Sequence, residues 1–199
     1  MQGQINRGSP LGELIYKTVL QPDIGIVVEI GTWNGQGSTR CVLDALKERP
    51  SCRFVSVESS PKWHAEAMQS VGTVPNVMLV LGRVIEPCDI PSMTLRPEQQ
   101  GWLKEDLDNY ATVPNVLGSI PDKIDLLILD GGEFTSTMEF DVLSNRARYI
   151  ILDDTNPATG TIKFPAVRER MLKGETPFNV IDDRVGDRNG WLFAKRRKT

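Results

Sequence analysis

Short apolar runs and amphipathic segments alternate along the chain. Five apolar runs have the length and β-branched character of strands. They lie at residues 25–30, 53–58, 77–81, 124–129 and 149–152. Between them, helical spacing or N-terminal capping signals predict helices, including a Ser136-x-x-Glu139 capping box. The predicted helices cover residues 10–20, 38–48, 62–70, 136–143 and 165–172. This alternation predicts an α/β fold with a doubly wound, mostly parallel sheet, because parallel strands need crossover connections.

The end of the chain departs from this alternation. Two apolar stretches, residues 178–181 and 191–194, flank the tetrapeptide Asp187-Arg188-Asn189-Gly190. An Asn-Gly pair before an apolar run is a strong hairpin signal. We therefore expect the chain to close with an antiparallel pair of strands.

The segment 86–121 has no strong strand pattern. It holds five prolines and an amphipathic piece around Trp102, Leu103, Leu107 and Tyr110. A lid or substrate-side insertion over a site fits this pattern, and so does a crossover helix with long loops. Both interpretations stay open.

Composition places the chain among ordinary globular proteins. It has 199 residues, of which 40% are hydrophobic and 25% charged, enough for one domain over 1–199 with a substantial core. The net charge of -3 argues against broad, charge-driven binding of nucleic acid, which needs a basic surface. Cys41, Cys52 and Cys88 form no C-x-x-C motif, so neither a zinc finger nor a disulfide framework is expected. Without an apolar leader or a membrane-length apolar run, we expect a cytoplasmic protein that does not enter membranes.

A glycine-rich turn joins the first predicted strand to the helix that begins at Ser38. The stretch GIVVEIGTWNGQGSTR contains Gly31, Gly35 and Gly37, and Glu29 stands near the end of the strand. Glycine tolerates positive φ and lets a ligand approach the backbone, and a helix N-terminus offers free N–H groups. The order is E-x-G-x-x-x-G-x-G rather than the dinucleotide pattern G-x-G-x-x-G. The turn therefore predicts a ligand site.

In an open α/β sheet, ligands lie beyond the carboxyl ends of the strands. The residues just past the predicted strands are Glu29 to Gly37, Glu58-Ser59, Gly82-Arg83, Asp130 to Glu133 and Asp153-Asp154. Most of these places are acidic. Glu58 has a specific use, because a carboxylate there can accept both hydrogens of a ribose diol. NAD enzymes and S-adenosylmethionine (SAM) enzymes share this feature.

Asp130, Asp153 and Asp154 follow two strands that we expect to be neighbours. Two carboxylates ~4 Å apart repel by about 4 kcal/mol at an effective dielectric near 20. A bound cation, a shared proton or a hydrogen-bond network must offset this repulsion. Oxygen ligands suit Mg²⁺, Mn²⁺ or Ca²⁺. Consecutive side chains of a strand point to opposite faces, so both Asp153 and Asp154 can face one ion only if the backbone bends there.

Four stretches together resemble class I SAM-dependent methyltransferases over most of the chain. They are VVEIGTWNGQGST, FVSVES, LLILDGG and IILDDTN. The DGG and DD motifs resemble those of divalent-metal-dependent O-methyltransferases, above all those of the cephalosporin-hydroxylase-like group. The resemblance implies a seven-stranded sheet with a C-terminal antiparallel hairpin, SAM as cofactor and a divalent metal.

The resemblance also implies roles for individual residues, with cofactor contact by Gly31, Gly35, Gly37 and Glu58. We predict further cofactor contacts at the neighbouring positions Glu29, Thr32, Trp33, Ser38, Ser59, Gly82, Arg83 and Asp130. Metal ligation falls to Asp130, Asp153 and Asp154.

The sequence departs from the group in one place. That group often has D-G-x-H after the fourth strand, and here the fourth position is Glu133. The chain's single histidine, His64, falls on another predicted helix. Glu133 and Lys163 are the candidates for taking a proton from the acceptor, which is the catalytic role predicted here.

Three functions follow as hypotheses. The favoured one is SAM-dependent O-methylation of a small hydroxylated molecule with help from a divalent metal. The alternatives are an NAD-dependent oxidoreductase on a doubly wound sheet and a SAM-binding module without catalysis. The pattern does not specify the acceptor, and exposure of Trp102 or Tyr110 would favour a homodimer.

Overall fold

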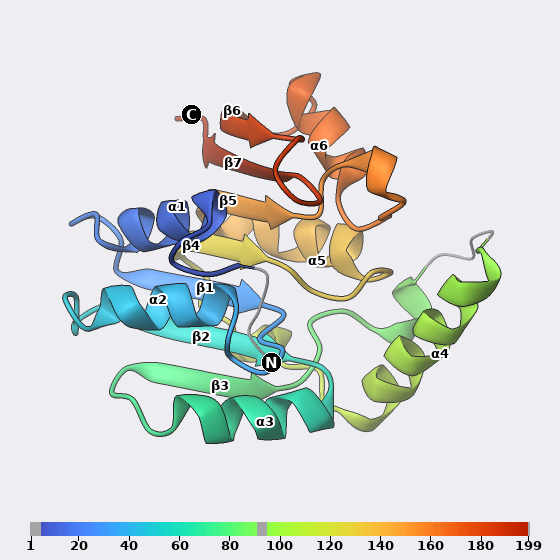
Figure 1. The fold of residues 1–199 in the computed structure, drawn as a ribbon, viewed down its shortest axis with the longest axis horizontal. Coiled ribbons are helices and arrows are strands. Elements are labelled where there is room, and N and C mark those ends of the chain that lie inside the picture. Colours follow the sequence, from blue (N-terminus) through green and yellow to red (C-terminus); the bar gives the residue numbers. More distant parts are fainter. Residues whose placement is uncertain (1–4, 91–94, 199) are drawn as a thin grey trace.

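The structure, a computed structural model, describes residues 5–90 and 95–198. One sheet of seven strands, in the order β3-β2-β1-β4-β5-β7-β6, forms the centre of the molecule (Figure 1). The strands are β1 Ile26–Ile30, β2 Arg53–Glu58, β3 Val77–Leu81, β4 Ile124–Leu129, β5 Ala147–Asp153, β6 Phe178–Arg184 and β7 Trp191–Arg196. β1 to β5 pair in parallel, and β7 pairs antiparallel with both β5 and β6. The predicted doubly wound sheet with a closing hairpin is confirmed.

Helices cover both faces of the sheet. They are α1 Pro10–Val19, α2 Ser38–Leu46, α3 Pro61–Val71, α4 Pro97–Thr112, α5 Ser136–Leu143 and α6 Pro165–Leu172. Short 3₁₀ turns η1 Pro87–Asp89, η2 Leu117–Ser119, η3 Ser144–Arg146 and η4 Pro157–Thr159 lie in the connections. His64 lies on α3, as predicted.

The central strands β1, β4 and β5 are mostly apolar because both of their faces are buried. Alternate residues enter two separate cores. Val28 packs into one core with Phe140 of α5, and Val27 packs into the other with Leu11 of α1 and Val42 of α2. Burial on both sides holds the strands in register and brings the carboxyl ends of β1 to β5 to one edge.

The segment between β3 and β4 carries α4, which lies beyond the carboxyl ends of the parallel strands (Figure 1). Arg83 follows β3, and its guanidinium donates to the carbonyl oxygens of Tyr110, at 2.8 Å, and Val113. It also pairs with Glu86 at 2.8 Å. Arg83 thereby ties the end of α4 to the sheet, and whether this segment acts as a lid stays a prediction.

The predicted capping box at the start of α5 is wrong, although the helix begins at Ser136 as expected. The N-cap residue is Thr135, which makes no side-chain cap hydrogen bond. The Ser136 hydroxyl instead donates to the Gly132 carbonyl at 2.6 Å. Glu139 is 1% exposed, and its carboxylate accepts from the Tyr110 hydroxyl at 2.8 Å. A contact with α4 replaces the cap, because α4 covers this end of α5.

Within the described parts of the chain, no helix combines the length and the apolar character needed to cross a membrane.

Candidate functional site

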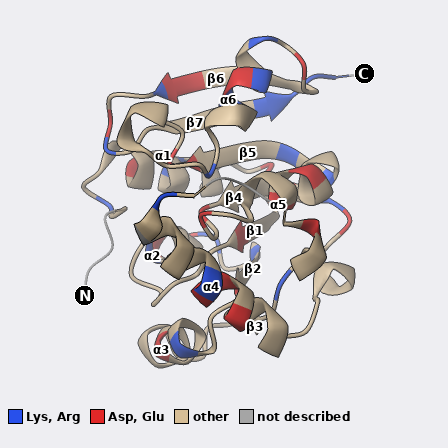
Figure 2. Cartoon of the chain, turned by 90° about the vertical axis from the view of Figure 1, so that its right-hand side faces the viewer, with Lys and Arg blue, Asp and Glu red and all other residues tan. Residues whose placement is uncertain are grey.

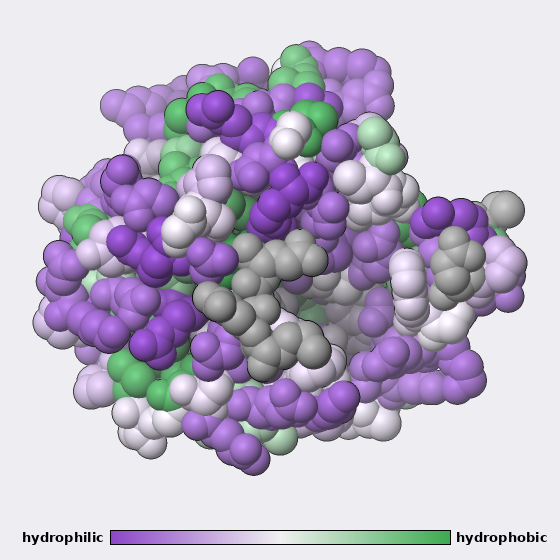
Figure 3. Space-filling model, viewed as in Figure 1, coloured by the Kyte–Doolittle hydropathy of each residue, from purple (hydrophilic) through white to green (hydrophobic). Residues whose placement is uncertain are grey.

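A cavity of about 810 Å³ lies at the carboxyl ends of β1 to β5, between the sheet and α4. In Figure 3 a recess separates the body of the molecule from the projecting segment that holds α4. Nearly all of the site residues predicted from the sequence line this cavity. They are Gly31, Thr32, Trp33, Gly37, Ser38, Glu58, Ser59, Gly82, Arg83, Asp130, Glu133, Asp153, Asp154 and Lys163. Glu29 and Gly35 are not among its lining residues.

The glycine turn is shaped by contacts that exclude side chains. Gly31 has φ +98°, and a Cβ there would lie 2.2 Å from the carbonyl oxygen of Asp130. Only glycine fits such a position without displacing the strand beside it. Trp33 also has positive φ, at 50°. Its indole lies 5.5 Å from that of Trp63, and both rings line the cavity.

Gly35 and Glu29 support the turn from behind. Gly35 has φ +76°, and a Cβ there would meet Ser70 of α3 at 2.8 Å, so this glycine permits close helix packing. The fully buried Glu29 carboxylate accepts from the hydroxyls of Thr39, at 2.6 Å, and Ser56, at 2.5 Å. Burial raises the pKa of Glu29 to about 7 despite these hydrogen bonds. Direct contact of Glu29 and Gly35 with a cofactor stays a prediction.

Glu58 stands at the end of β2, as the sequence indicates. Its carboxylate oxygens accept from the backbone N–H groups of Trp33, at 2.7 Å, and Ser60, at 2.8 Å. Burial raises the pKa of Glu58 to about 7. Each carboxylate oxygen can accept a second hydrogen bond, so both remain able to bind hydroxyl groups in the cavity.

Three carboxylates gather at the ends of β4 and β5, which are neighbouring parallel strands. One oxygen from each of Asp130, Asp153 and Asp154 lies within 4.8 Å of the other two. The backbone bend that this arrangement needs is present, because Asp154 has φ 58° and leaves the extended path of β5. The structure therefore brings together all three residues of the predicted metal site.

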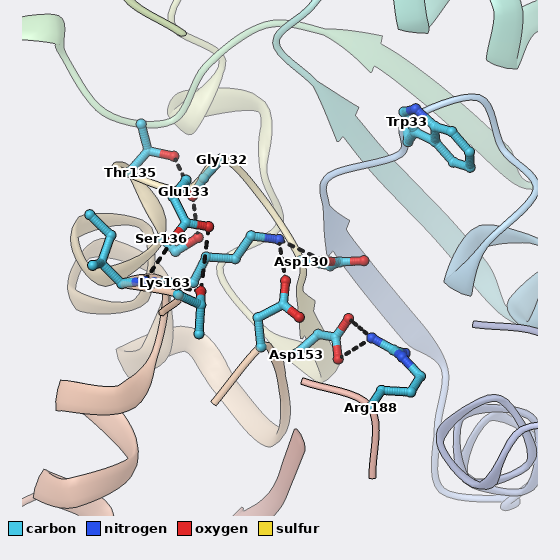
Figure 4. A network of polar contacts seen from close by, with 12 residues as sticks. Trp33, Asp130, Gly132, Glu133, Thr135, Ser136, Asp153, Lys163 and Arg188 are labelled. Carbon is cyan, nitrogen blue, oxygen red and sulfur yellow. Dashed lines mark hydrogen bonds and ion pairs between the residues drawn. The ribbon is translucent and has the colours of Figure 1, made fainter. Parts of the chain in front are cut away.

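Two cations enter this carboxylate cluster (Figure 4). The Lys163 ammonium lies 3.1 Å from Asp130 and 2.8 Å from Asp154. The Arg188 guanidinium donates to both oxygens of Asp153, at 2.9 and 2.6 Å. These ion pairs offset the repulsion among the aspartates. They are the compensation that the sequence analysis expects at this place.

The cluster also determines where protons reside. Burial disfavours the charge of Lys163, but Asp130 and Asp154 more than compensate, so its pKa is raised. Burial raises the pKa of Asp153, and repulsion from Asp130 adds to the effect. Lys163 is thus a protonated ammonium in this arrangement. Its predicted role as a base stays a prediction, and the ion pairs weigh against it.

Sequence reasoning missed four functional candidates that line the cavity: Asp106, Tyr110, Glu139 and Arg188. Arg188 lies in the β6–β7 loop at φ 53°, which only the closed hairpin brings to β5. The sequence favours a capping role for Glu139, because it stands at capping-box spacing. The helical spacing of Asp106 and Tyr110 on α4 signals a shared face, but only the fold shows that this face meets the strand ends.

Comparison with known proteins identifies the fold. No protein-family model and no curated protein sequence matches the chain. Among solved structures, the SAH-bound methyltransferase PaMTH1 of Podospora anserina matches with a TM-score of 0.63 and 14% identity, over 94% of this chain and 78% of that one. The O-methyltransferase TomG of Streptomyces achromogenes, involved in tomaymycin synthesis and solved with SAM, matches with a TM-score of 0.61 and 19% identity, over 95% and 80%. A precorrin-6y C5,15-methyltransferase of Geobacter metallireducens matches with a TM-score of 0.58 and 13% identity, over 100% and 94%.

The chain therefore has the Rossmann-like fold of class I SAM-dependent methyltransferases, as the resemblance predicts. The three neighbours are methyltransferases with different names. Because their sequences are less than 20% identical to this chain, the likeness establishes the fold alone.

Proposed function

We propose that the protein is a SAM-dependent methyltransferase that methylates a hydroxyl oxygen of a small molecule. One observation carries the proposal: the glycine turn, Glu58 and the carboxylate cluster all line the same cavity. A nucleoside site and a charged reaction site in one cavity are what methyl transfer requires. NAD-dependent oxidation has no comparable support, because the glycine order differs from the dinucleotide pattern.

The residues at the glycine turn fit SAM. Gly31 lets the turn pass directly against the Asp130 carbonyl, and Gly37 and Ser38 at the N-terminus of α2 line the cavity. Glu58 would accept from the ribose hydroxyls, and the indoles of Trp33 and Trp63 would pack against the nucleoside. Thr32, Ser59, Gly82 and Arg83 would complete the walls. These residues hold and orient the nucleoside, so that its methyl group faces the acceptor.

Asp130, Asp153 and Asp154 fit a divalent metal. Their donor atoms are all oxygens, which Mg²⁺, Mn²⁺ and Ca²⁺ prefer. Asp154 Oδ1 is buried and has no hydrogen-bond partner among the described residues, so it is free to bind a cation. A bound metal would act as a Lewis acid that lowers the pKa of an acceptor hydroxyl. Lys163 and Arg188 would hold the aspartates in place.

Glu133 is the better placed of the two predicted bases. It lines the cavity three residues after Asp130, and its carboxylate accepts from the Ile162 N–H at 2.7 Å. This hydrogen bond orients the carboxylate while leaving lone pairs for an acceptor hydroxyl. We assign proton removal to Glu133, and we assign to Lys163 the holding of Asp130 and Asp154.

Methyl transfer from isotopically labelled SAM to a set of small hydroxylated molecules tests this proposal. We expect transfer that EDTA lowers and that Mg²⁺, Mn²⁺ or Ca²⁺ restores. Asp154→Asn is expected to lower turnover at least tenfold while SAM binding survives, because the aspartate acts on the acceptor side. Asp182→Asn is the control. Asp182 lies in β6 and pairs with Arg184, and neither residue lines the cavity.

The outcomes separate the hypotheses. Full activity of Asp154→Asn would contradict the metal role. Binding of S-adenosylhomocysteine (SAH) with no transfer to any acceptor would favour a SAM-binding module. Stabilisation against heat by NADH but not by SAH would favour the oxidoreductase.

A further inference from the structure

The acceptor side of the cavity has a large excess of acidic groups. Among the residues that the structure describes, eight carboxyl side chains line the cavity, against three cationic ones. Lys163 and Arg188 are already paired with the aspartate cluster, and Arg83 is bound to carbonyl oxygens and to Glu86. The carboxylates contributed by α4 and α5 are therefore left without a cation from the described part of the chain.

Two of these carboxylates, those of Asp106 on α4 and Glu139 on α5, lie beside the two glycines that follow Asp130. A Cβ on Gly131 would lie 2.4 Å from the Glu139 carboxylate, and a Cβ on Gly132 would lie 3.0 Å from that of Asp106. The two glycines that follow Asp130 thus leave the space these carboxylates occupy. Figure 2 looks toward the carboxyl ends of the parallel strands and shows α4 in front of them, with acidic positions along it.

Glu139, which lines the cavity, has one carboxylate oxygen without a donor. The residue is 1% exposed, and its Oε1 accepts from Tyr110 at 2.8 Å. Its Oε2 is buried and has no hydrogen-bond partner among the residues that the structure describes. A buried carboxylate oxygen without a donor costs free energy, which a donor supplied by a ligand would recover.

Burial is costly for both groups. It raises the pKa of Glu139 to about 7, although hydrogen bonds from Tyr110 and Thr135 and the charge of Lys163 act in the opposite direction. It raises the pKa of Asp106 to about 6, where the Glu105 carboxylate adds to the effect and Lys163 opposes it. Among the described residues, neither side chain forms an ion pair within 4 Å. A neutral acceptor would leave this cost in place, and an anionic acceptor would increase it. A cation with N–H donors would remove it.

Resting on the proposed function, we propose that the methyl acceptor carries a protonated amine, which the carboxylates of Asp106 and Glu139 bind. Two further residues suit such a ligand. Tyr110 holds the Glu139 carboxylate in place through its hydroxyl. Trp102 is 51% exposed and lines the cavity, so it offers an aromatic surface to the ligand.

The test measures binding of three probes that differ in charge: tyramine (cationic), 4-ethylphenol (neutral) and 4-hydroxyphenylacetate (anionic). Each is titrated into SAH-saturated protein at pH 7.5 with EDTA, which removes any metal. We expect tyramine to bind about tenfold more tightly than 4-ethylphenol, with the anion the weakest. Equal or weaker binding of tyramine, or no binding of it at all, would overturn the proposal.

Variants locate the preference. Asp106→Asn and Glu139→Gln are each expected to reduce the preference for tyramine at least threefold. Asp108→Asn is the matched control, because Asp108 lies on the same helix, pairs with Lys104 and is not among the lining residues. Thermal unfolding and SAH affinity verify that each variant is folded. A preference unchanged in both cavity variants would also overturn the proposal.

The same titrations separate this inference from the proposed function. SAH binding without a preference for the cation would refute only the amine-bearing acceptor. Failure to bind SAH would refute the proposed function, and titration of the SAH-free protein would still measure the preference among the three probes.

Discussion

At the scale of single residues, the site depends on backbone positions that ordinary side chains avoid. Gly31 at φ +98° begins the turn, Trp33 at φ 50° follows it, and Asp154 at φ 58° comes directly after β5. Such conformations cost of order 1–3 kcal/mol for a non-glycine residue and cluster at functional sites. Each of the three lines the cavity.

The first prediction concerns Gly31. Gly31→Ala should lower the free energy of unfolding by about 2 kcal/mol or more, from positive φ and the contact with the Asp130 carbonyl. Urea unfolding measures the change. Gly118→Ala is the control, because a Cβ there meets nothing within 4 Å, and its effect should stay within about 0.5 kcal/mol. Equal effects of the two variants would contradict the assigned role of Gly31.

The second prediction concerns pH. Glu139 has a folded pKa of about 7, raised first by burial, against an ordinary value of 4.5. The folded state therefore holds its proton more tightly than the unfolded state between these values. The resulting stability is fully present below pH 4.5 and is lost as pH rises to about 7. It amounts to at most about 3 kcal/mol.

Glu139→Gln removes this titration, so unfolding free energy measured from pH 4.5 to 7.5 should decline less steeply than in the wild type. Glu29 and Glu58 have raised pKa values as well, so part of the decline should remain. Identical slopes in the two proteins would show that Glu139 does not titrate as described.

At the scale of elements, the position of α4 determines how the cavity is closed. The Tyr110 hydroxyl bonds Glu139 of α5, and Arg83 supplies a second connection, from the end of β3. The helix contributes Trp102, Asp106 and Tyr110 to the cavity wall. Movement of α4 would therefore change the acceptor side and leave the glycine turn in place.

Arg83→Met tests this connection. The substitution removes hydrogen bonds to two carbonyl oxygens and an ion pair, each worth about 1–3 kcal/mol when a charged group donates. We expect amide hydrogen exchange in α4 to become about tenfold faster or more, with exchange in β4 unchanged. Lys104→Met, an exposed change on α4, should not alter the exchange. Unaltered exchange in Arg83→Met would contradict the role of Arg83 in holding α4 to the sheet.

Most strands were predictable from the sequence. β2, β3 and β4 have the predicted bounds, because a short, mostly apolar run between turn residues has few alternatives. The site residues at strand ends followed from the same pattern. Contacts between distant segments were not predictable: Glu139 meets Tyr110 across 29 positions, and Arg188 meets Asp153 across 35. The capping-box prediction failed for this reason, since a tertiary partner replaced the local one.

At the scale of the whole molecule, the parallel sheet collects the ends of five strands at one edge. The glycine turn and Glu58 lie toward β1 and β2, and the aspartate cluster lies at β4 and β5. α4 closes the space above them (Figure 1). Under the proposed function, this arrangement divides the cavity into a nucleoside side and an acceptor side. The homodimer stays a prediction, although Tyr110 is buried and Trp102 lines the cavity.

Calorimetric titration of SAH into the wild type and into Glu58→Gln tests the central claim most directly, with Glu66→Gln on the exposed face of α3 as control. Saturable binding is expected, at one SAH per chain. Glu58→Gln should weaken it about 10- to 100-fold, because hydrogen bonds from the ribose to a charged carboxylate are lost. The control should bind like the wild type. No binding, or binding unaffected by Glu58→Gln, would contradict the account.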